Sequence, residues 1–142
     1  MQSTVYAGAA KWTAAKNKDH QFGLFRLKAG SDDWENLTAG GLPDNCEVRA
    51  IVVDPRQTNR LYIGTQVGPY VSENGGDSWK SLPLGSDNAV TWSILLHPTD
   101  EKVIYVGTQN QGVFRTTNGG TSWEELNVPE PAGLCRMGFP SR

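Results

Sequence analysis

The hydrophobic positions of this chain fall into short runs that recur along the sequence. Residues 48–53 (VRAIVV) and 91–96 (TWSILL) are two such runs, and each is followed within two residues by a proline. Residues 61–65 (LYIGT) and 104–108 (IYVGT) come next, rich in the β-branched and aromatic side chains that favour strands. Because a proline donates no hydrogen bond to a sheet ladder, it marks the end of a strand. The pattern therefore predicts two similar pairs of β-strands.

A third strand and a tight turn follow each pair. The third strands are predicted at residues 68–72 (GPYVS) and 112–116 (GVFRT). The turn segments that follow are residues 72–79 (SENGGDSW) and 116–123 (TTNGGTSW). Paired glycines allow the positive φ angles that a tight hairpin requires. We therefore predict a fourth strand after each turn, paired with the third.

The spacing of three tryptophans sets the repeat length. Trp34, Trp79 and Trp123 are separated by 45 and 44 residues, a period typical of four-stranded propeller blades. The first copy is incomplete, because residues 4–8 and 23–27 match only the second and third strands. Its turn has kept the tryptophan and lost the Asn and the paired glycines.

The sequence therefore predicts an all-β fold, a β-propeller segment of about three blades of four antiparallel strands. The blade boundaries are expected near residues 4–38, 47–83 and 90–127, with the first strand missing from the first blade. Residues 11–21 are a polar insertion and are expected to form a surface loop. Residues 128–142 are expected to form either the start of a further blade or a loop.

The two turn segments resemble the Asp-box, or BNR repeat, whose pattern is Ser/Thr-x-Asp-x-Gly-x-Ser/Thr-Trp. The matching residues are Ser72, Asn74, Gly76, Ser78 and Trp79, and Thr116, Asn118, Gly120, Ser122 and Trp123. Both copies carry Asn in place of Asp, which keeps a short side-chain acceptor for the turn. The resemblance covers residues 4–126. It implies a β-propeller similar to sialidase-like, sortilin-like and photosystem assembly factor-like proteins, with the Asp-box as a structural device at the outer edge of each blade.

Composition and charge argue against some partners. The net charge is −2 and no block of like charges occurs, which disfavours a nucleic-acid-binding face. No apolar run is long enough to span a membrane, and the first residues lack the pattern of a signal peptide. The two cysteines, Cys46 and Cys135, are far apart in sequence and are expected to be free. We predict a cytoplasmic protein without a nucleic-acid or membrane partner.

No catalytic, cofactor-binding or metal-binding residue is predicted. A sialidase requires an arginine triad, a tyrosine nucleophile with a glutamate, and an aspartic acid. Tyr62 and Tyr105 occupy equivalent repeat positions, so we interpret them as packing residues. His97 stands where the preceding repeat has Asp54, and it is predicted to cap the turn after a strand.

Arg49, Trp92 and Arg136 are the candidate ligand-binding residues. Arg49 and Trp92 hold equivalent positions in the first strands, which line the central channel of a propeller, and Arg136 joins them if the tail is a strand. An Arg and a Trp facing one channel can hold a carboxylate or a sugar ring. The alternative is that Arg49 pairs with Glu47 or Asp44 while Trp92 packs between blades. The insertion at residues 11–21 is a second candidate binding segment or a tolerated surface loop.

Propellers close with roughly four to eight blades, and about three leave strand edges uncovered. Two explanations stay open: a symmetric dimer with six blades, or a chain that is part of a longer protein. The leading hypothesis is a non-catalytic binding or scaffold module for an unknown protein or small-molecule ligand. The alternative is a fragment of a sialidase-like glycoside hydrolase, which needs two carboxylates roughly 5–10 Å apart in one cleft.

Overall fold

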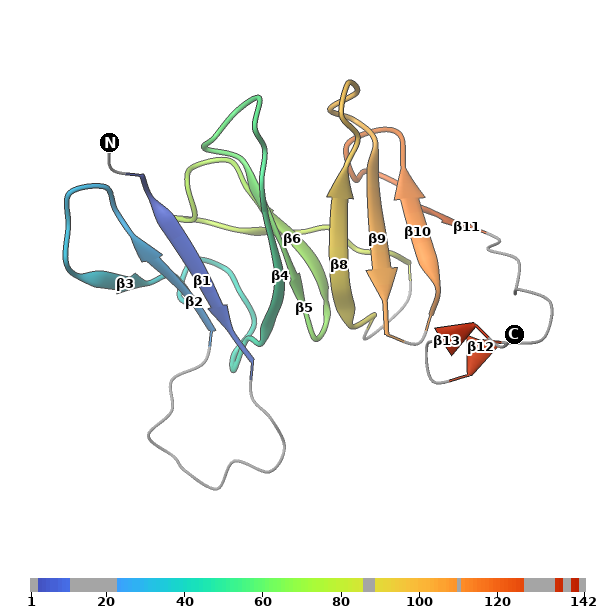
Figure 1. Cartoon of the computed structure of the whole chain (residues 1–142), viewed down its shortest axis with the longest axis horizontal. Coiled ribbons are helices and arrows are strands. Elements are labelled where there is room, and N and C mark those ends of the chain that lie inside the picture. Colours follow the sequence, from blue (N-terminus) through green and yellow to red (C-terminus); the bar gives the residue numbers. More distant parts are fainter. Residues whose placement is uncertain are drawn as a thin grey trace.

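The computed structural model describes residues 3–10, 23–85, 89–109 and 111–126, together with the backbone of residues 135–136 and 139–140. Three antiparallel sheets stand side by side in this part of the chain (Figure 1). Their strand orders are β1-β2-β3, β4-β5-β6-β7 and β8-β9-β10-β11. The strands are β1 (Val5–Ala9), β2 (Gly23–Leu27), β3 (Trp34–Asn36), β4 (Val48–Val53), β5 (Leu61–Thr65), β6 (Gly68–Ser72), β7 (Lys80–Ser81), β8 (Thr91–Leu96), β9 (Ile104–Thr108), β10 (Val113–Thr116) and β11 (Glu124–Leu126). The predicted all-β class and the strands of each repeat are present.

Two predicted regions lie wholly or partly outside the described residues. The insertion at residues 11–21 is one of them. In the tail, the backbone of β12 (Cys135–Arg136) pairs with that of β13 (Phe139–Pro140) in a short antiparallel hairpin. The tail therefore contains two short paired strands of two residues each. They are shorter than β4 and β8, the first strands of the complete sheets, which have six residues each.

Alternation along the strands places a hydrophobic core on each side of the middle sheet. Leu61 and Ile63 of β5 belong to the core shared with the N-terminal sheet, whereas Tyr62 belongs to the core shared with the sheet of β8–β11. All three side chains are buried. Because successive residues of a strand point to opposite faces, a sheet between two others is apolar on both. The near-continuous hydrophobic sequence of β5 follows from this position.

A glycine repeated in the second strand of each repeat lets neighbouring sheets approach closely. A Cβ atom on Gly8 of β1 would lie 2.6 Å from Val48 Cγ1, at the start of β4. A Cβ atom on Gly64 of β5 would lie 2.7 Å from the carbonyl oxygen of Thr91, at the start of β8. A larger residue at either position would therefore push away the first strand of the following sheet.

The turns that follow the first strands are capped by side chains. Asp54 Oδ1 accepts hydrogen bonds from the Arg56 amide (2.9 Å) and from Arg56 Nε (3.2 Å). His97 Nδ1 accepts from the amides of Thr99 (3.2 Å) and Asp100 (3.1 Å), which confirms the predicted cap. Two chemically different residues therefore provide the same acceptor for the turn.

The Asp54 carboxyl is almost completely buried, and burial alone would raise its pKa. The hydrogen bonds from Arg56 and the charge of Arg60 outweigh burial and lower the pKa from its ordinary value. Arg56 also donates to the carbonyl oxygen of His97 at 3.0 Å, which links the turns of two neighbouring sheets. Asp54 is therefore a charged structural residue.

Over the described ranges, no helix has the length and apolar character needed to cross a membrane.

Candidate functional site

Arg49 and Trp92 occupy the same irregular position in two successive sheets. In β4 the register with β5 shifts between Val48 and Ala50, so Arg49 is the extra residue of a β-bulge. In β8 the register with β9 shifts in the same way around Trp92. Bulges re-aim a side chain and are common next to functional sites. The bulge thus turns both side chains out of the regular alternation of their strands.

The two side chains are in direct contact. The guanidinium carbon of Arg49 lies 4.6 Å from the centroid of the Trp92 ring, within the range of a cation–π interaction. Trp92 remains 48% exposed, so one side of this stacked pair is open to solvent. The structure therefore brings together two of the three predicted ligand-binding residues.

Polar neighbours hold each member of the stack in place. Glu47 Oε2 accepts from Arg49 at 3.0 Å, and Gln109 Oε1 accepts from Trp92 Nε1 at 3.1 Å. The equivalent glutamine one sheet earlier, Gln66, accepts from the Glu47 amide at 2.8 Å. The Arg49–Glu47 pair that sequence analysis gave as an alternative is thus present together with the Arg49–Trp92 stack. We name Glu47, Arg49, Trp92 and Gln109 the bulge site.

The side chains of the bulge site suit a ligand with both a flat apolar face and polar edges. A half-exposed indole offers a large planar surface, and the Arg and Glu beside it provide a donor and an acceptor. Only a few well-placed polar groups are needed to orient a ligand on such a surface. The third predicted residue, Arg136, has a side chain outside the described residues, as does the whole insertion at residues 11–21.

The two Asp-box turns have the same internal hydrogen bonds. In the first turn, Asn74 Oδ1 accepts from Ser72 Oγ and from the Ser78 amide, both at 2.9 Å, and Asn74 Nδ2 donates to Ser78 Oγ at 2.8 Å. Ser72 Oγ in turn accepts from the Gly76 amide at 2.8 Å. Gly75 and Gly76 have φ angles of 71° and 100°, which residues with a Cβ rarely adopt.

The second turn repeats this arrangement residue by residue. Asn118 Oδ1 accepts from Thr116 Oγ1 at 2.8 Å and from the Ser122 amide at 3.0 Å, while Asn118 Nδ2 donates to Ser122 Oγ at 2.8 Å. The Gly120 amide donates to Thr116 Oγ1 at 2.9 Å. The polar residues of both turns therefore bind the turn itself, and they are not directed at a ligand.

The tryptophans of the two turns differ in environment. Trp79 is 8% exposed, packs in the core with the N-terminal sheet, and donates from Nε1 to the Gly76 carbonyl at 3.0 Å. Trp123 is half-buried against the core with the middle sheet, and its buried Nε1 has no hydrogen-bond partner. In the first repeat, Trp34 is 50% exposed.

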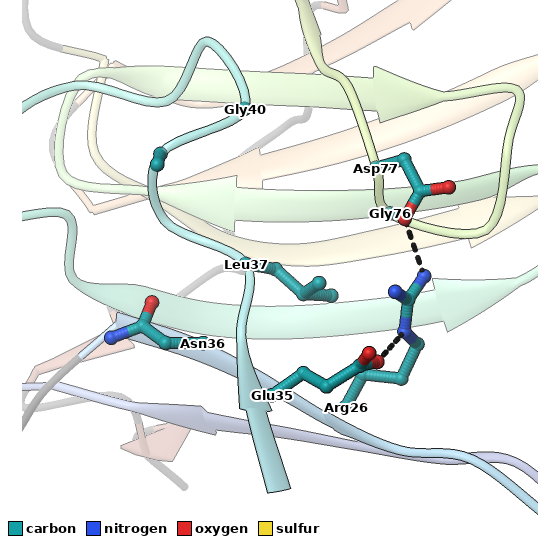
Figure 2. A pocket seen from close by; sticks show the side chains of 8 residues that line it. Arg26, Glu35, Asn36, Leu37, Gly40, Gly76 and Asp77 are labelled. Atoms are coloured by element: carbon teal, nitrogen blue, oxygen red, sulfur yellow. Dashed lines mark hydrogen bonds and ion pairs between the residues drawn. The ribbon is translucent and has the colours of Figure 1, made fainter.

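A second polar site, which sequence analysis missed, joins the N-terminal and middle sheets. Arg26 of β2 is 7% exposed, and it donates to Glu35 Oε2 at 2.7 Å and to the Gly75 carbonyl at 2.8 Å. It also pairs with Asp77 Oδ1 at 2.9 Å. Figure 2 shows the guanidinium between the two carboxylates, at the edge of an open pocket of about 340 Å³. Tyr6 donates to the same Gly75 carbonyl at 2.8 Å.

Charge pairing accounts for the titration of this second site. Burial would lower the pKa of Arg26, but the hydrogen bonds and charges of Glu35 and Asp77 raise it from its ordinary value. The same hydrogen bond from Arg26 lowers the pKa of Glu35. The site is fully occupied by its own partners, so it joins two sheets and does not offer an open charge. The one sequence feature that points to this second site is Asp77, an acidic residue inside an Asp-box turn.

The described residues offer little reactive chemistry. They contain no group of three or more His, Cys, Asp or Glu side chains arranged to hold a metal ion. Tyr62 is buried, and that burial raises the pKa of its hydroxyl. Burial and the charge of Glu47 raise the pKa of the Cys46 thiol to about 11. Neither group is poised as a nucleophile at neutral pH.

Three antiparallel sheets in a row, two of them with the same Asn-Gly-Gly turn at matching places, define a segment of a β-propeller of the Asp-box type. The family model described as Sortilin-Vps10 (Sortilin, neurotensin receptor 3) matches residues 68–140, about half of the chain. The chain belongs to this family. Both the resemblance to Asp-box propellers and the predicted propeller fold are confirmed.

Curated relatives fall into two kinds of protein. One is an oligoxyloglucan-reducing end-specific xyloglucanase of Emericella nidulans, 27% identical over 82% of this chain and 15% of its own length. Another is a vacuolar protein sorting/targeting protein 10 of Ajellomyces capsulatus, 28% identical over 66% of this chain and 6% of its own length. The chain therefore spans only a small part of the relatives it matches.

Solved structures show the same fold. An ancestral GH74 enzyme is 26% identical, with a TM-score of 0.60 over 72% of this chain and 15% of that chain. The structure of YCF48 bound to D1 peptide has a TM-score of 0.59 and 16% identity over 87% of this chain and 37% of that chain. The second likeness concerns the fold alone.

Proposed function

We propose that this chain is a non-catalytic binding module of a β-propeller, and that its bulge site holds a carbohydrate. The observation that carries the proposal is the half-exposed Trp92 ring stacked on Arg49. Because Gln109 holds the indole edge and Arg49 covers one face, the surface is organised before a ligand arrives. A sugar ring placed on the open side of the indole would find polar groups within reach of its hydroxyls.

The relatives support a carbohydrate over other small ligands. Two of them are named for xyloglucan: the Emericella nidulans enzyme, and a xyloglucanase of Hypocrea jecorina that is 24% identical over 70% of this chain. A carboxylate-bearing peptide is the competing ligand, because an Arg also recognises a carboxylate through paired donors. The glutamate that already occupies Arg49 disfavours a second carboxylate there.

The distribution of carboxylates supports a non-catalytic role. The strands β4 (VRAIVV) and β8 (TWSILL) contain no Asp or Glu. Glu47, just before β4, is already paired with Arg49 at 3.0 Å. A glycosidase needs two carboxylates facing one bond of the substrate, one as acid and one as base or nucleophile. The described first strands do not supply such a pair.

A second candidate function follows from the same relatives. Their similarity to xyloglucanases favours a part of a xyloglucan-degrading enzyme, in which the bulge site would hold a sugar unit and other blades would supply the two carboxylates. Release of reducing sugar from xyloglucan by this chain would support the enzyme and contradict the non-catalytic proposal.

The proposed binding is tested with xyloglucan oligosaccharides and with a short acidic peptide, each titrated against the protein by calorimetry. We expect the oligosaccharide to bind and Trp92→Ala to weaken binding by roughly ten-fold or more, about 1.4 kcal/mol. Leu95→Ala is the matched control, because Leu95 is exposed on the same strand and has no aromatic face. Unchanged binding by Trp92→Ala, or no binding of any oligosaccharide, would refute the proposal, and binding of the peptide alone would assign the site to carboxylates.

We also propose that the ring closes by self-association, with two copies supplying six blades. Three sheets are fewer than the roughly four to eight blades that closed propellers contain. Light scattering tests this: a dimer has about twice the chain mass of 15.5 kDa. A monomer would favour closure by further blades of a longer chain. The predicted cytoplasmic location and the predicted lack of nucleic-acid and membrane partners stay predictions.

A further inference from the structure

The first and last of the three sheets carry the same row of residues across their strands. Each row contains a tyrosine, an arginine and a glutamate placed opposite one another on the second, third and fourth strands of the repeat. The rows are Tyr6, Arg26 and Glu35 in the N-terminal sheet, and Tyr105, Arg115 and Glu124 in the sheet of β8–β11. In the second row Arg115 Nε donates to Glu124 Oε1 at 2.7 Å, as Arg26 does to Glu35.

In this structure the first row, Tyr6, Arg26 and Glu35, binds a turn of the neighbouring sheet. It holds the Asp-box turn of the following sheet, through Arg26 and the Gly75 carbonyl (2.8 Å) and through Arg26 and Asp77 (2.9 Å). Beside it, Leu37 packs so closely under Gly76 that a Cβ there would lie 2.6 Å from Leu37 Cδ1. The row is therefore a receptor for a turn with an acidic residue two positions before its tryptophan.

The middle sheet shows that the third-strand residue of the row and the turn docked on it differ together from those of the first row. At the position of Arg26 it carries Val71, and the turn that docks on it carries Thr121 where the preceding turn has Asp77. Leu82 takes the place of Leu37, with a Cβ on Gly120 2.8 Å from its Cδ2. The row of the middle sheet, Tyr62, Val71 and the exposed Lys80, thus has no arginine on its third strand and meets an uncharged turn, whereas the row with Arg26 meets an aspartate.

The second arginine row has no such turn on it among the described residues. The Arg115 side chain is 37% exposed and Leu126, at the position of Leu37, is half-buried. Both Asp-box turns of the chain are engaged elsewhere, one on the N-terminal sheet and one on the middle sheet. By its residue types, this row needs a turn that carries an aspartate.

The N-terminal sheet presents a matching turn and an uncovered apolar face. Its turn at residues 27–34 has the length of the Asp-box turns, and the exposed Asp32 stands two positions before Trp34, as Asp77 does before Trp79. Trp34 is 50% exposed, whereas Trp79 is 8% exposed under the preceding sheet. Val5, which pairs with Leu27 at the start of this turn, is 46% exposed, whereas its counterpart Leu61 is 0% exposed.

We propose that the Tyr105–Arg115–Glu124 row docks the N-terminal sheet of a second copy of this chain, with Arg115 paired to Asp32 of that copy. The inference rests on the proposed closure by self-association and specifies its contact. In the resulting ring the third-strand residues of the three rows are Arg26, Val71 and Arg115. The turns that dock on them carry Asp77, Thr121 and Asp32, in the same order. The contact covers Trp34 and Val5 of the second copy, as the existing contacts cover Trp79 and Leu61.

One feature of the docked turn differs from the Asp-box turns. Ser31 stands where Gly76 does, and it lacks the positive φ of that glycine. A serine side chain therefore meets Leu126, and the leucine takes a different position from that of Leu37. The Arg–Asp pair and the uncovered tryptophan do not depend on this glycine.

Charge exchange tests the contact with the full chain. We expect Arg115→Glu and Asp32→Arg each to weaken self-association by roughly 100-fold, because like charges then meet at both contacts of a symmetric dimer. Mixing the two variants restores opposite charges at both contacts, so we expect a mixed dimer in sedimentation equilibrium. Lys102→Glu is the control, since it makes the same change in net charge as Arg115→Glu at an exposed residue in a turn outside both faces.

The outcomes separate this inference from the closure on which it rests. A wild-type chain that stays monomeric overturns both. A wild-type dimer that neither variant weakens more than the control overturns the Arg115–Asp32 contact and leaves self-association standing. Dissociation of each variant without rescue in the mixture also overturns the pairing. Circular dichroism of each variant checks that the sheets remain folded.

Discussion

Replacing Asn74 by alanine removes the side chain that organises the first Asp-box turn. Three hydrogen bonds are lost: those that Oδ1 accepts from Ser72 Oγ and the Ser78 amide, and the one that Nδ2 donates to Ser78 Oγ. A typical intramolecular hydrogen bond contributes about 0.5–1.5 kcal/mol net, and we place these partly exposed bonds near the low end of that range. We expect Asn74→Ala to lower the free energy of unfolding by about 1.5–2 kcal/mol.

The Asn74→Asp variant isolates the role of the acceptor oxygen. An aspartate keeps the oxygen that faces Ser72 and the Ser78 amide, and the Ser78 hydroxyl can rotate to donate to the second oxygen. We therefore expect this variant to differ from the wild type by less than about 0.5 kcal/mol. In the worn turn of the first repeat, Ala29 stands at the position of Asn74, with Leu27 at that of Ser72. Ala29→Asn, as a control, should gain nothing because its partner hydroxyl is missing.

Urea denaturation followed by tryptophan fluorescence measures these changes. With a slope of about 1.5 kcal/mol/M, a loss of 1.5–2 kcal/mol moves the midpoint by about 1 M urea. All variants are compared at one protein concentration, because self-association makes apparent stability depend on it. The reasoning is wrong if Asn74→Ala unfolds at the wild-type midpoint, or if Asn74→Asp is as destabilised as the alanine variant.

Three further predictions concern the packing and titration of buried groups. Gly64→Ala should cost about 2–3 kcal/mol of unfolding free energy in the same denaturation assay, because its Cβ would lie 2.7 Å from backbone of the next sheet; Gly107→Ala, whose Cβ meets only a serine side chain, should cost less. Asp54→Asn should cost about 2 kcal/mol at pH 7; because the folded pKa lies below the ordinary 3.8, the difference from wild type should shrink as the pH falls below about 4, and a constant difference down to pH 2 would contradict it. In a Cys135→Ser background, the Cys46 thiol, with its pKa raised to about 11, should react with a disulfide reagent at pH 8 only after unfolding, and rapid labelling of the folded chain would contradict this burial.

Local sequence was enough to predict the blades and their turns. Strand alternation and paired glycines act within a few residues, and the 44- and 45-residue tryptophan spacing repeats them along the chain. The Asn74 and Asn118 turns are present as local structures because every partner of each side chain lies within four residues. The choice of Arg49 and Trp92 also came from the repeat alone, since they are unlike residues at equivalent positions.

The contacts between sheets were decided only in three dimensions. The sequence predicts that Arg26 lies in a strand. Nothing near it in sequence indicates that Gly75 and Asp77, some fifty residues later, contact its guanidinium. Likewise, only the packing of β4 against β8 brings Arg49 to 4.6 Å from the Trp92 ring. Hydrogen bonds within a turn depend on backbone geometry that a short segment encodes, whereas pairs between blades depend on how whole sheets stack. The repeat therefore specifies each blade, and the stacking of the blades determines which side chains meet.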